Sequence, residues 1–215
     1  MEIVVLGCGS QARYVIDNLV SRGLPAPIAL VDIEDGRMVG ASINGVPVRW
    51  SLADMARHLR PDRCGFVVAH GENQRKLDIV ERFASRGFTF HAALHASASI
   101  SPSARIGSGA IVNAGAVILP NATVHEHAIV HSGCVIEHDC SIGRAANIAS
   151  GATLAGRVEV GMAAYLYTGC RIAPGVKIGA HAVIGAGAVV LSSIPDRAVA
   201  FGVPARQQQS RISES

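Results

Sequence analysis

The stretch ISPSARIGSGAIVNAGAVI, residues 100–118, repeats a pattern of six residues, and this pattern decides the fold. Every sixth residue from position 100 to position 190 is aliphatic. Four positions after each of them, up to residue 188, stands Ala, Cys or Val, and glycine often follows the aliphatic residue directly. Chance does not produce such a run in a chain with 49% hydrophobic residues. The aliphatic positions are Ile100, Ile106, Val112, Ile118, Val124, Val130, Ile136, Ile142, Ile148, Leu154, Val160, Leu166, Ile172, Ile178, Ile184 and Val190.

This hexapeptide repeat predicts a parallel β-helix, in which each hexapeptide supplies one short strand and one turn. Three hexapeptides complete a triangular coil of 18 residues, so roughly five coils fit between residues 100 and 190. Stacked coils lie about 4.8 Å apart, the ordinary spacing of hydrogen-bonded strands. We expect the aliphatic side chain to point inward and the small residue to fill the tight corner beside it. No insertion breaks the period, so the prism should be smooth-sided.

The stretch CVIEHDCSIG, residues 134–143, combines two cysteines, a histidine and two carboxylates, which suit a metal site, a thiol–histidine pair or an acid–base centre. The repeat separates these possibilities. Cys134, Cys140 and Cys170 all fall on the small inward position, where Ala usually stands. This placement favours small buried apolar side chains over metal ligands or nucleophiles.

Composition and charge exclude several classes of function. The chain has 215 residues, enough for one large domain or two small ones. It has no apolar run of about 18 residues and no basic segment before its first strand, which predicts neither a membrane span nor a secretion signal. A net charge of +3 without a dense Lys/Arg cluster argues against nucleic-acid binding. Five cysteines in such a chain indicate reduced thiols and a cytoplasmic location.

The N-terminal part shows a different pattern, in which strands alternate with helices. Apolar runs predict strands over residues 2–7, 27–32 and 65–71, and helical spacing predicts helices over residues 10–23, 51–60 and 72–87. This alternation predicts a small parallel, Rossmann-like α/β sheet. We therefore expect an α/β nucleotide-sugar-binding domain over residues 1–92, a β-helix acyltransferase domain over residues 93–206, and a polar tail over residues 207–215.

A glycine-rich loop joins the first strand to the first helix. GCGSQA places Gly7, Gly9 and Ala12 in a G-x-G-x-x-A pattern, and Asp32 follows twenty residues after Ala12. Such glycines let a phosphate approach a helix N-terminus. The pattern fits a dinucleotide site, but the unit is short and better matched to a mononucleotide or a nucleotide sugar. A tight strand-to-helix turn without a ligand is the other interpretation.

Together, the glycine-rich α/β part and the uninterrupted prism resemble a known family. The motifs SISPSARIG, IEHDCSIG and FGVPAR are its most specific features. The chain is similar to bacterial sugar acyltransferases of the sialic acid O-acetyltransferase and UDP-4-amino-sugar N-acetyltransferase type (bacillosamine, perosamine). The resemblance implies left-handed β-helix trimers that take acetyl from acetyl-CoA, with active sites between neighbouring prisms. It implies no metal.

The resemblance assigns His138 as general base and Asp139 as its acidic partner. This assignment agrees with acyl-transfer chemistry, because the attacking amine or hydroxyl must lose a proton to a base that a carboxylate can orient. Gly156 stands 18 residues after His138, one full coil, and should lie on the next rung. We expect its N–H to stabilise the tetrahedral oxyanion.

The family's other contacts transfer to positions that match its motifs. At the position of a family histidine near CoA, nine residues after the base, this chain has Asn147. The glycine-rich loop also departs from the family, with Ser10, Gln11 and Ala12. The expected acetyl-CoA contacts are Asn147, Ala155, Gly156, Thr168, Gly185, Ala186 and Arg206. The expected nucleotide-sugar contacts are Gly7, Gly9, Ser10, Gln11, Arg13, Asp32 and Lys76.

The leading hypothesis is therefore a cytoplasmic, trimeric N-acetyltransferase that acts on a nucleotide-linked amino sugar in surface glycan synthesis. O-acetylation of a sialic-acid-like sugar is the alternative. A non-catalytic trimer scaffold and a nucleotide-binding oxidoreductase are the hypotheses from other classes. His125, His127 and His131 fall on outward positions, where turn or interface roles are favoured over a metal site. His91 and His95 stand at the domain junction, where we expect structural roles.

Overall fold

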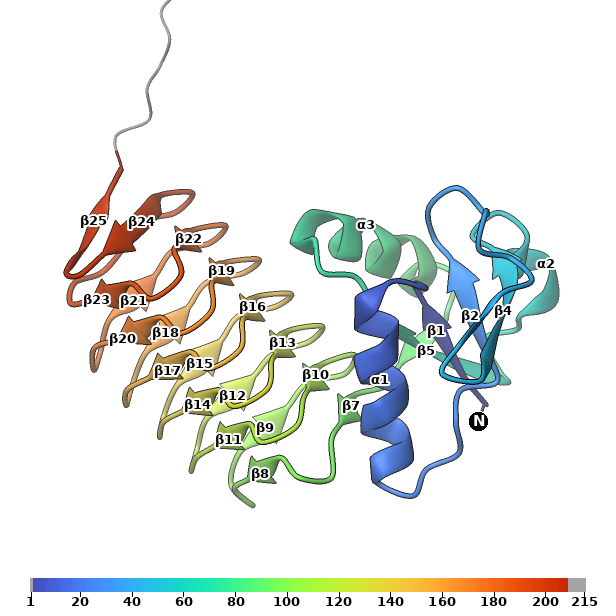
Figure 1. Ribbon diagram of the computed structural model, residues 1–215, viewed down its shortest axis with the longest axis horizontal. Helices are drawn as coiled ribbons and strands as arrows, with labels where there is room; N and C mark the ends of the chain where they lie inside the picture. The colour runs from blue at the N-terminus through green and yellow to red at the C-terminus, as the bar shows by residue number, and fades with distance from the viewer. Residues whose placement is uncertain (1, 209–215) are drawn as a thin grey trace, which may run out of the picture.

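The computed structural model describes residues 2–208 and shows two parts side by side, an α/β part and a β-helix (Figure 1). The fold class predicted from the sequence is confirmed: a small, mainly parallel α/β sheet precedes a parallel β-helix. The N-terminal strands are β1 (Glu2–Leu6), β2 (Ala29–Asp32), β3 (Ser42–Ile43), β4 (Val46–Ser51), β5 (Cys64–Val68) and β6 (Thr89–Phe90). The helices are α1 (Ser10–Ser21), α2 (Met55–His58) and α3 (Asn73–Ala84).

The strand order of the N-terminal sheet is β3-β4-β2-β1-β5-β6. Its neighbours are parallel except for β3 and β4, which form an antiparallel hairpin at one edge. The chain passes from β1 to β2 on one side and returns to β5 on the other side of β1. Open α/β sheets bind ligands at such a reversal, beyond the carboxyl ends of the strands.

Helices α1 and α3 form where the apolar spacing predicts them. Val15 and Leu19 lie on the buried face of α1, and Phe83 lies on that of α3. Each helix is followed by a glycine with positive φ, Gly23 at +72° and Gly87 at +82°. Glycine adopts this left-handed conformation without the steric cost of a Cβ, which ends the helix.

The helix predicted over residues 51–60 is wrong in extent, because only the single turn α2 is helical. The hydroxyl of Ser51 accepts a hydrogen bond from the Asp54 N–H at 3.2 Å, which builds a turn in place of the first helical residues. At the other end, Pro61 disfavours helical backbone at the residue before it.

The sequence analysis missed the β3–β4 hairpin, although the chain carries a signal for it. Asn44 and Gly45 form its turn with φ values of 46° and 80°. Two consecutive positive φ values are typical of the two-residue turn that Asn-Gly favours between antiparallel strands. The predicted parallel sheet therefore has a mixed edge.

The β-helix has three sheets, with eight, six and five strands. The eight-stranded sheet contains β7 (Ala93–Leu94), β10 (Ile111–Val112), β13 (Ile129–Val130), β16 (Asn147–Ile148), β19 (Tyr165–Leu166), β22 (Val183–Ile184), β24 (Val199–Gly202) and β25 (Ala205–Gln207). The six-stranded sheet contains β8 (Ser99–Ile100), β11 (Val117–Ile118), β14 (Val135–Ile136), β17 (Thr153–Leu154), β20 (Arg171–Ile172) and β23 (Val189–Val190). The five-stranded sheet contains β9 (Arg105–Ile106), β12 (Thr123–Val124), β15 (Ser141–Ile142), β18 (Glu159–Val160) and β21 (Lys177–Ile178).

The register confirms the coil of 18 residues. Val117 pairs with Val135, and Val135 pairs with Thr153, in parallel strands of the six-stranded sheet. The predicted aliphatic and small positions from residue 110 to residue 190 form one continuous buried core. Cys134, Cys140 and Cys170 belong to this core, as their position in the repeat predicts.

Helix α1 packs against the outer face of the eight-stranded sheet. Val15 and Leu19 share an apolar cluster with Ile111 and Ile129 of β10 and β13. The amide of Asn18 is buried in this contact and donates to backbone oxygens of the sheet at 3.1 and 3.2 Å. Since a buried amide must be hydrogen-bonded, Asn18 fixes the position of α1 along the sheet.

The C-terminal end of the β-helix is closed by a hairpin. β24 continues the eight-stranded sheet, and β25 pairs with it in antiparallel fashion. The predicted polar tail thus begins later than residue 207, because Gln207 belongs to β25 and the Gln208 N–H donates to Val199 O at 2.8 Å. The rest of that tail, residues 209–215, lies outside the described residues. Among residues 2–208, no helix is long and apolar enough to cross a membrane.

Candidate active site

His138 and Asp139 lie in the turn between β14 and β15, at the corner that joins the six-stranded and five-stranded sheets. We call the turns 119–122, 137–140, 155–158 and 173–176 the His138 corner. His138 Nδ1 donates to Asp139 Oδ2 at 2.8 Å, and each side chain is about half exposed, at 46% and 47%. The second ring nitrogen, Nε2, therefore carries the lone pair that can accept a proton.

A further residue, which the sequence analysis missed, completes the environment of Asp139. Asn121, one coil earlier, donates from Nδ2 to Asp139 Oδ1 at 3.1 Å. The hydrogen bonds from His138 and Asn121 lower the pKa of the Asp139 carboxyl, and the charge of Arg157 adds to this effect. Asp139 therefore stays ionised and can hold the imidazole. The signal was present, because Asn121 precedes Asp139 by one period of the repeat.

The ring of His138 lies directly over Gly156, one coil later. A Cβ at position 156 would stand 2.4 Å from His138 Nε2, closer than atoms can approach without a shift. Among residues 2–208, no protein acceptor meets the Gly156 N–H, whereas the Arg157 N–H donates to His138 O at 2.9 Å. Only glycine lets the imidazole lie over this turn, as the 18-residue spacing predicts.

A pocket of about 210 Å³ opens beyond the carboxyl ends of β1, β2 and β5, at the reversal of the strand order. Four of the predicted nucleotide-sugar contacts line it, from the loop that enters α1. No side chain caps the N-terminus of α1, which leaves backbone N–H groups for an anion. The lining residues are Gly7, Cys8, Gly9, Ser10, Gln11, Ile33, Glu34, Ala69, His70 and Gly71.

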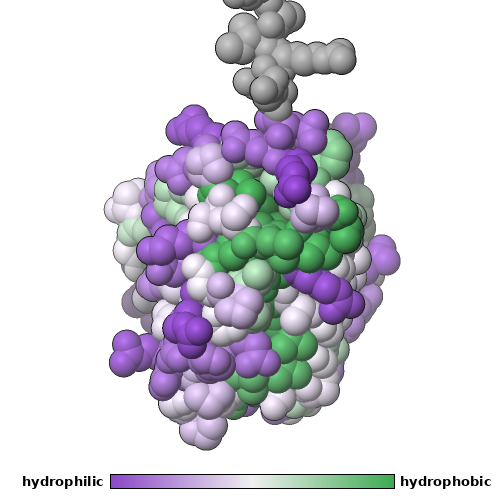
Figure 2. Space-filling model, turned by 90° about the vertical axis from the view of Figure 1, so that its left-hand side faces the viewer, coloured by the Kyte–Doolittle hydropathy of each residue, from purple (hydrophilic) through white to green (hydrophobic). Residues whose placement is uncertain are grey.

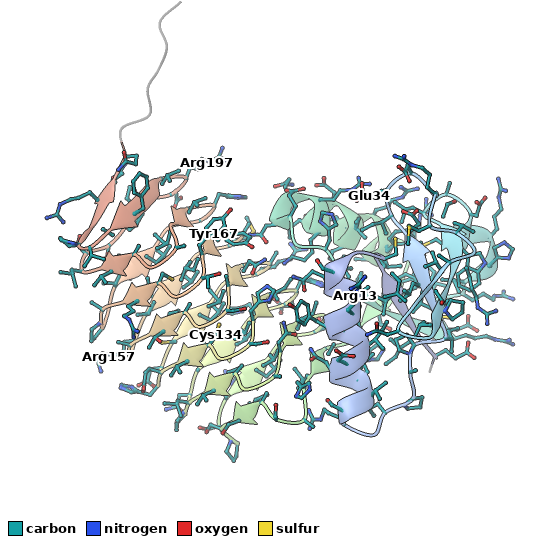
Figure 3. All side chains as sticks on the ribbon, in the orientation of Figure 1. Arg13, Glu34, Cys134, Arg157, Tyr167 and Arg197 are labelled. Carbon is teal, nitrogen blue, oxygen red and sulfur yellow. The ribbon has the colours of Figure 1, made fainter. Side chains whose placement is uncertain are left out.

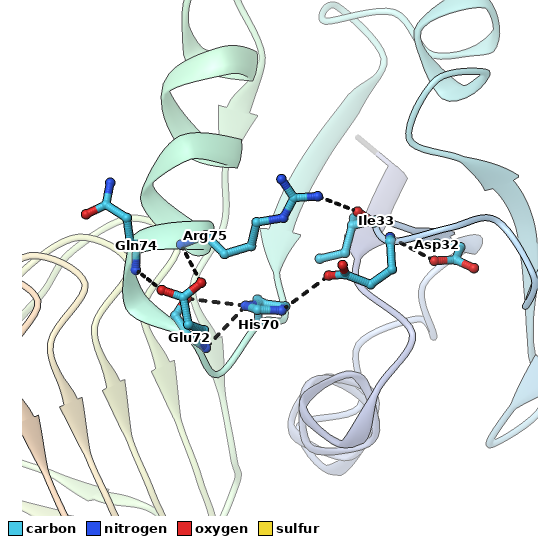
Figure 4. Close-up of polar contacts among 7 residues, drawn as sticks. Asp32, Ile33, His70, Glu72, Gln74 and Arg75 are labelled. Atoms are coloured by element: carbon cyan, nitrogen blue, oxygen red, sulfur yellow. Dashed lines mark hydrogen bonds and ion pairs between the residues drawn. The ribbon is translucent and has the colours of Figure 1, made fainter.

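Polar contacts between two loops shape the far wall of this pocket (Figure 4). His70 Nε2 lies 3.4 Å from Glu34 Oε1, and Arg75 donates to Ile33 O at 2.8 Å. The Glu72 carboxylate accepts from the first N–H groups of α3 and caps that helix. The sequence analysis did not select these residues, because their contact depends on loops from two distant segments meeting in space.

The structure places the other predicted nucleotide-sugar residues away from the pocket lining. Asp32 is buried, and its two oxygens accept from the N–H groups of Glu34 and Met38 at 2.9 and 3.0 Å, so it organises the loop after β2. Arg13 is exposed on α1. Lys76 is fully buried in α3 without a hydrogen-bond partner, which corrects its predicted role as a ligand contact.

The predicted acetyl-CoA contacts fall on two corners. Ala155 and Gly156 belong to the His138 corner. Thr168, Gly185 and Ala186 lie on a second corner, between the eight-stranded and six-stranded sheets. We call the turns 131–134, 149–152, 167–170 and 185–188 the Thr168 corner. A single ligand that touches all these residues therefore has to reach two corners of the prism.

Arg206 and Asn147 lie apart from both sets of turns. Arg206 lies in β25, and its guanidinium donates to the Ala205 carbonyl at 3.2 Å. Asn147 is fully buried, and its amide donates to Gly71 O at 3.3 Å. Its side chain therefore ties the β-helix to the N-terminal part, which corrects its predicted role as a CoA contact.

The pocket borders the Thr168 corner of the same chain. Gln11 of the pocket lies 3.4 Å from the ring of His131, Nε2 to Nε2, and Gly71 accepts the hydrogen bond from Asn147. The His138 corner, in contrast, joins the two sheets that α1 does not cover. Figure 3 shows Arg157, next to Gly156, at the edge of the β-helix farthest from Arg13 and Glu34. Nucleotide pocket and base thus lie on opposite sides of one chain.

The remaining histidines have structural neighbours. His127 was expected to point outward, but it is buried against the Phe90 ring, and burial lowers its pKa to about 4. His131 lies between α1 and the β-helix, and His125 contacts the Ser141 hydroxyl at 3.2 Å. Within residues 2–208, no group of three or more His, Cys, Asp or Glu side chains could hold a metal ion.

The cysteines are poorly suited to nucleophilic chemistry. Burial raises the pKa of the Cys134 thiol to about 11 and that of Cys170 to about 12. Cys8, in the pocket wall, has its pKa raised to about 11 by burial and by the nearby charge of Asp32. Since the thiolate is the reactive form, none of these three side chains is an activated nucleophile.

Comparison with known proteins identifies both parts of the chain. Residues 2–83 match the PglD N-terminal domain, and residues 121–156 and 157–192 match the bacterial transferase hexapeptide of six repeats. No curated protein matches the chain.

Several solved structures match over nearly the whole chain. PerB from Caulobacter crescentus, in complex with CoA and GDP-perosamine, is 36% identical over 97% of this chain and 98% of its own, with a TM-score of 0.89. Variants of that N-acetyltransferase with one histidine replaced by Ala or Asn match at 35% identity. The acetyltransferase domain of PglB from Neisseria gonorrhoeae FA1090, in complex with acetyl coenzyme A, is 30% identical over 96% and 98% of the two chains, with a TM-score of 0.89. WeeI from Acinetobacter baumannii AYE is 26% identical over 97% and 100%, with a TM-score of 0.84.

The match extends across both parts of the chain, at identities of up to 36% with almost complete coverage. It therefore includes the N-terminal pocket and the His138 corner together. The chain belongs to the family of PglD-type N-acetyltransferases, acetyl-CoA-dependent sugar acetyltransferases with a hexapeptide-repeat β-helix.

Proposed function

We propose that the protein transfers an acetyl group from acetyl-CoA to the amino group of a nucleotide-linked amino sugar, of the UDP-4-amino-sugar type, in surface glycan synthesis. The observation that carries this proposal is the pair of His138 and Asp139 over the side-chain-free turn at Gly156. The same chain has a glycine-rich pocket suited to a nucleotide. The relatives crystallised with CoA and GDP-perosamine, and with acetyl coenzyme A, support both substrate classes.

The proposed reaction is a direct transfer in a ternary complex. The sugar amine attacks the thioester carbonyl carbon, and His138 Nε2 takes the proton that the amine loses. The Gly156 N–H donates to the oxyanion of the tetrahedral intermediate. When the C–S bond breaks, the CoA sulfur leaves as a thiolate and receives a proton, and the acetamide is formed. Asp139 holds the imidazole throughout and stabilises its cation.

The nucleotide sugar is proposed to occupy the pocket beyond β1, β2 and β5. Gly7 and Gly9 let the diphosphate approach the backbone, and Ser10 and Gln11 face it at the start of α1. Acetyl-CoA is proposed to extend past Thr168, Gly185 and Ala186 toward Gly156. Arg206 supplies a positive charge for its phosphates.

The separation of pocket and base favours an oligomer, and we propose a homotrimer. The pocket of one chain borders its own Thr168 corner, so the His138 corner of a neighbouring prism has to complete the site. The view of the β-helix from the side away from the N-terminal part shows a strip of apolar side chains within a hydrophilic surround (Figure 2). Leu191 and Val203 are 63% and 75% exposed. Exposed apolar surface of this kind is typical of an interface.

The test is thiol release from acetyl-CoA with a panel of UDP- and GDP-linked amino sugars, beside free and nucleotide-activated sialic acids. We expect turnover on an amino-sugar nucleotide, with kcat reduced by about a thousandfold or more in His138→Ala. Turnover on hydroxyl acceptors alone would move the assignment to O-acetylation. Full activity of His138→Ala would refute the proposed base.

A further inference from the structure

We propose that Asn121 is a positioning residue for this acetyl transfer: it fixes the Asp139 carboxylate, which in turn orients the His138 imidazole. This inference rests on the proposed function. The two oxygens of Asp139 have different partners, since Oδ2 accepts from His138 Nδ1 at 2.8 Å and Oδ1 accepts from Asn121 Nδ2 at 3.1 Å. The three side chains form a continuous chain of hydrogen bonds along the His138 corner.

The repeat itself brings Asn121 to this place. Asn121, Asp139 and Arg157 follow one another at 18-residue intervals and stack on three successive coils. All three have a left-handed backbone, with φ values of 61°, 59° and 61°. This conformation turns each side chain in the same way, so that neighbours along the column can touch. The Asn121 N–H donates to the Ser103 hydroxyl at 3.2 Å, which fixes its backbone from the coil below.

A carboxylate held by one hydrogen bond can rotate about the bond between Cβ and Cγ, because this torsion has broad minima. The amide of Asn121 removes that freedom, since it holds the second oxygen. With the carboxylate plane fixed, Oδ2 stays in line with the Nδ1–H of His138. The imidazole then keeps one tautomer, with Nε2 unprotonated and directed over Gly156.

The environment of Asp139 favours the same arrangement electrostatically. Two donors and the nearby Arg157 charge lower the pKa of this carboxyl. An ionised Asp139 can only accept hydrogen bonds, so the proton between the two side chains belongs to His138. Asn121 is therefore part of what defines the base, although it does not touch the reacting atoms.

Asparagine is also common at left-handed positions for purely conformational reasons. The experiment must therefore separate backbone conformation from side-chain contact. Asn121→Gly keeps the left-handed backbone and removes the amide. Asn121→Asp keeps the shape and replaces the donor with a second carboxylate. His181→Gly is the matched control, because His181 has φ of 57° on another corner and its ring makes no hydrogen bond within residues 2–208.

For Asn121→Gly we expect kcat to fall about tenfold with both KM values unchanged, the effect of losing one hydrogen bond to a charged group. For Asn121→Asp, the added negative charge stabilises the imidazolium. We therefore expect the acid limb of the kcat/KM profile to move to higher pH by about one unit. His181→Gly should retain the wild-type kcat and pH profile. All variants are compared at equal thermal stability of the fold.

A second readout does not depend on turnover. Nitrogen-detected NMR of the His138 imidazole at pH 8 should show the Nδ1–H tautomer in the wild type and a mixture of tautomers in Asn121→Gly. Unchanged kcat, pH limb and tautomer in both Asn121 variants would overturn the positioning role, and an inactive His138→Ala would still support the proposed function. Conversely, an active His138→Ala beside a changed tautomer would reject the base and retain the contact.

Discussion

A single hydrogen bond, between His138 Nδ1 and Asp139 Oδ2, decides which nitrogen of the imidazole can accept a proton. The neighbouring coil provides the rest of the catalytic geometry, because the ring needs a residue without a side chain beneath it. Gly156 meets that requirement and also offers its N–H. Base and oxyanion donor are thus brought together by a step of 18 residues along one corner.

At this scale, Gly156→Ala should lower kcat by about a hundredfold while leaving the melting temperature close to that of the wild type. The new Cβ would stand 2.4 Å from His138 Nε2 and would push the exposed ring away from its position. Steady-state kinetics and thermal denaturation check this prediction. A variant with wild-type kcat would show that the imidazole does not react from its position over Gly156.

At the scale of single elements, α3 makes an unusual contact with the β-helix. Leu77 packs against Ala145 and Ala163, and the Asn73 amide donates to Ala163 O at 2.9 Å. Lys76 lies in the same helix, and its charge also acts on the buried ring of His127. Burial lowers the pKa of Lys76 to about 7, because the ammonium has lost its hydration and has no hydrogen-bond partner.

This burial makes stability depend on pH. Between about pH 7 and pH 10, unfolded Lys76 binds a proton that the folded form releases, so the wild type should become more stable as pH rises through this window. Lys76→Met fills the same space without a charge. It should stabilise the fold at pH 7 by about 1–3 kcal/mol, an advantage that disappears toward pH 10.

Thermal denaturation across pH 7–10 measures this difference. Lys177, the other lysine of the chain, is the matched control, since it is exposed and pairs with Glu159. Lys177→Met should not raise the melting temperature at any pH. Equal pH dependence in the wild type and in Lys76→Met would mean that Lys76 is hydrated in solution.

At the scale of the whole molecule, the two halves of the proposed active site do not meet within one chain. Helix α1 fixes the nucleotide pocket beside the eight-stranded sheet, whereas the His138 corner lies opposite that sheet. In a ring of three chains, each pocket can face the His138 corner of its neighbour. The proposed trimer thus follows from where α1 packs.

Mixed trimers test this arrangement. Gly9→Asp places a carboxylate at the proposed phosphate position, where a Cβ meets no other atom, so the fold should persist while nucleotide binding is lost. Chains with Gly9→Asp and chains with His138→Ala should each be inactive alone. Coexpressed in equal amounts, they should recover about a quarter of wild-type activity, because each mixed ring of three contains one intact site. Mixed rings without activity would place pocket and base in the same chain.

The sequence by itself determined the β-helix, its 18-residue coil and the burial of Cys134, Cys140 and Cys170, because these depend on a period that every coil repeats. It also determined α1, α3, the glycine-rich loop and the stacking of His138 under Gly156. These features follow from local spacing, which the chain carries in its order of residues.

Only the tertiary structure decided which polar side chains face a ligand. Asp32, Lys76 and Asn147 match the family's contact positions in sequence, yet packing between the N-terminal part and the β-helix buries them. The contact of Glu34 with His70 and the placement of the pocket opposite His138 arise in the same way. The physical reason is that these contacts join segments far apart in the chain, and their positions depend on how α1 and α3 pack on the outer faces of the prism.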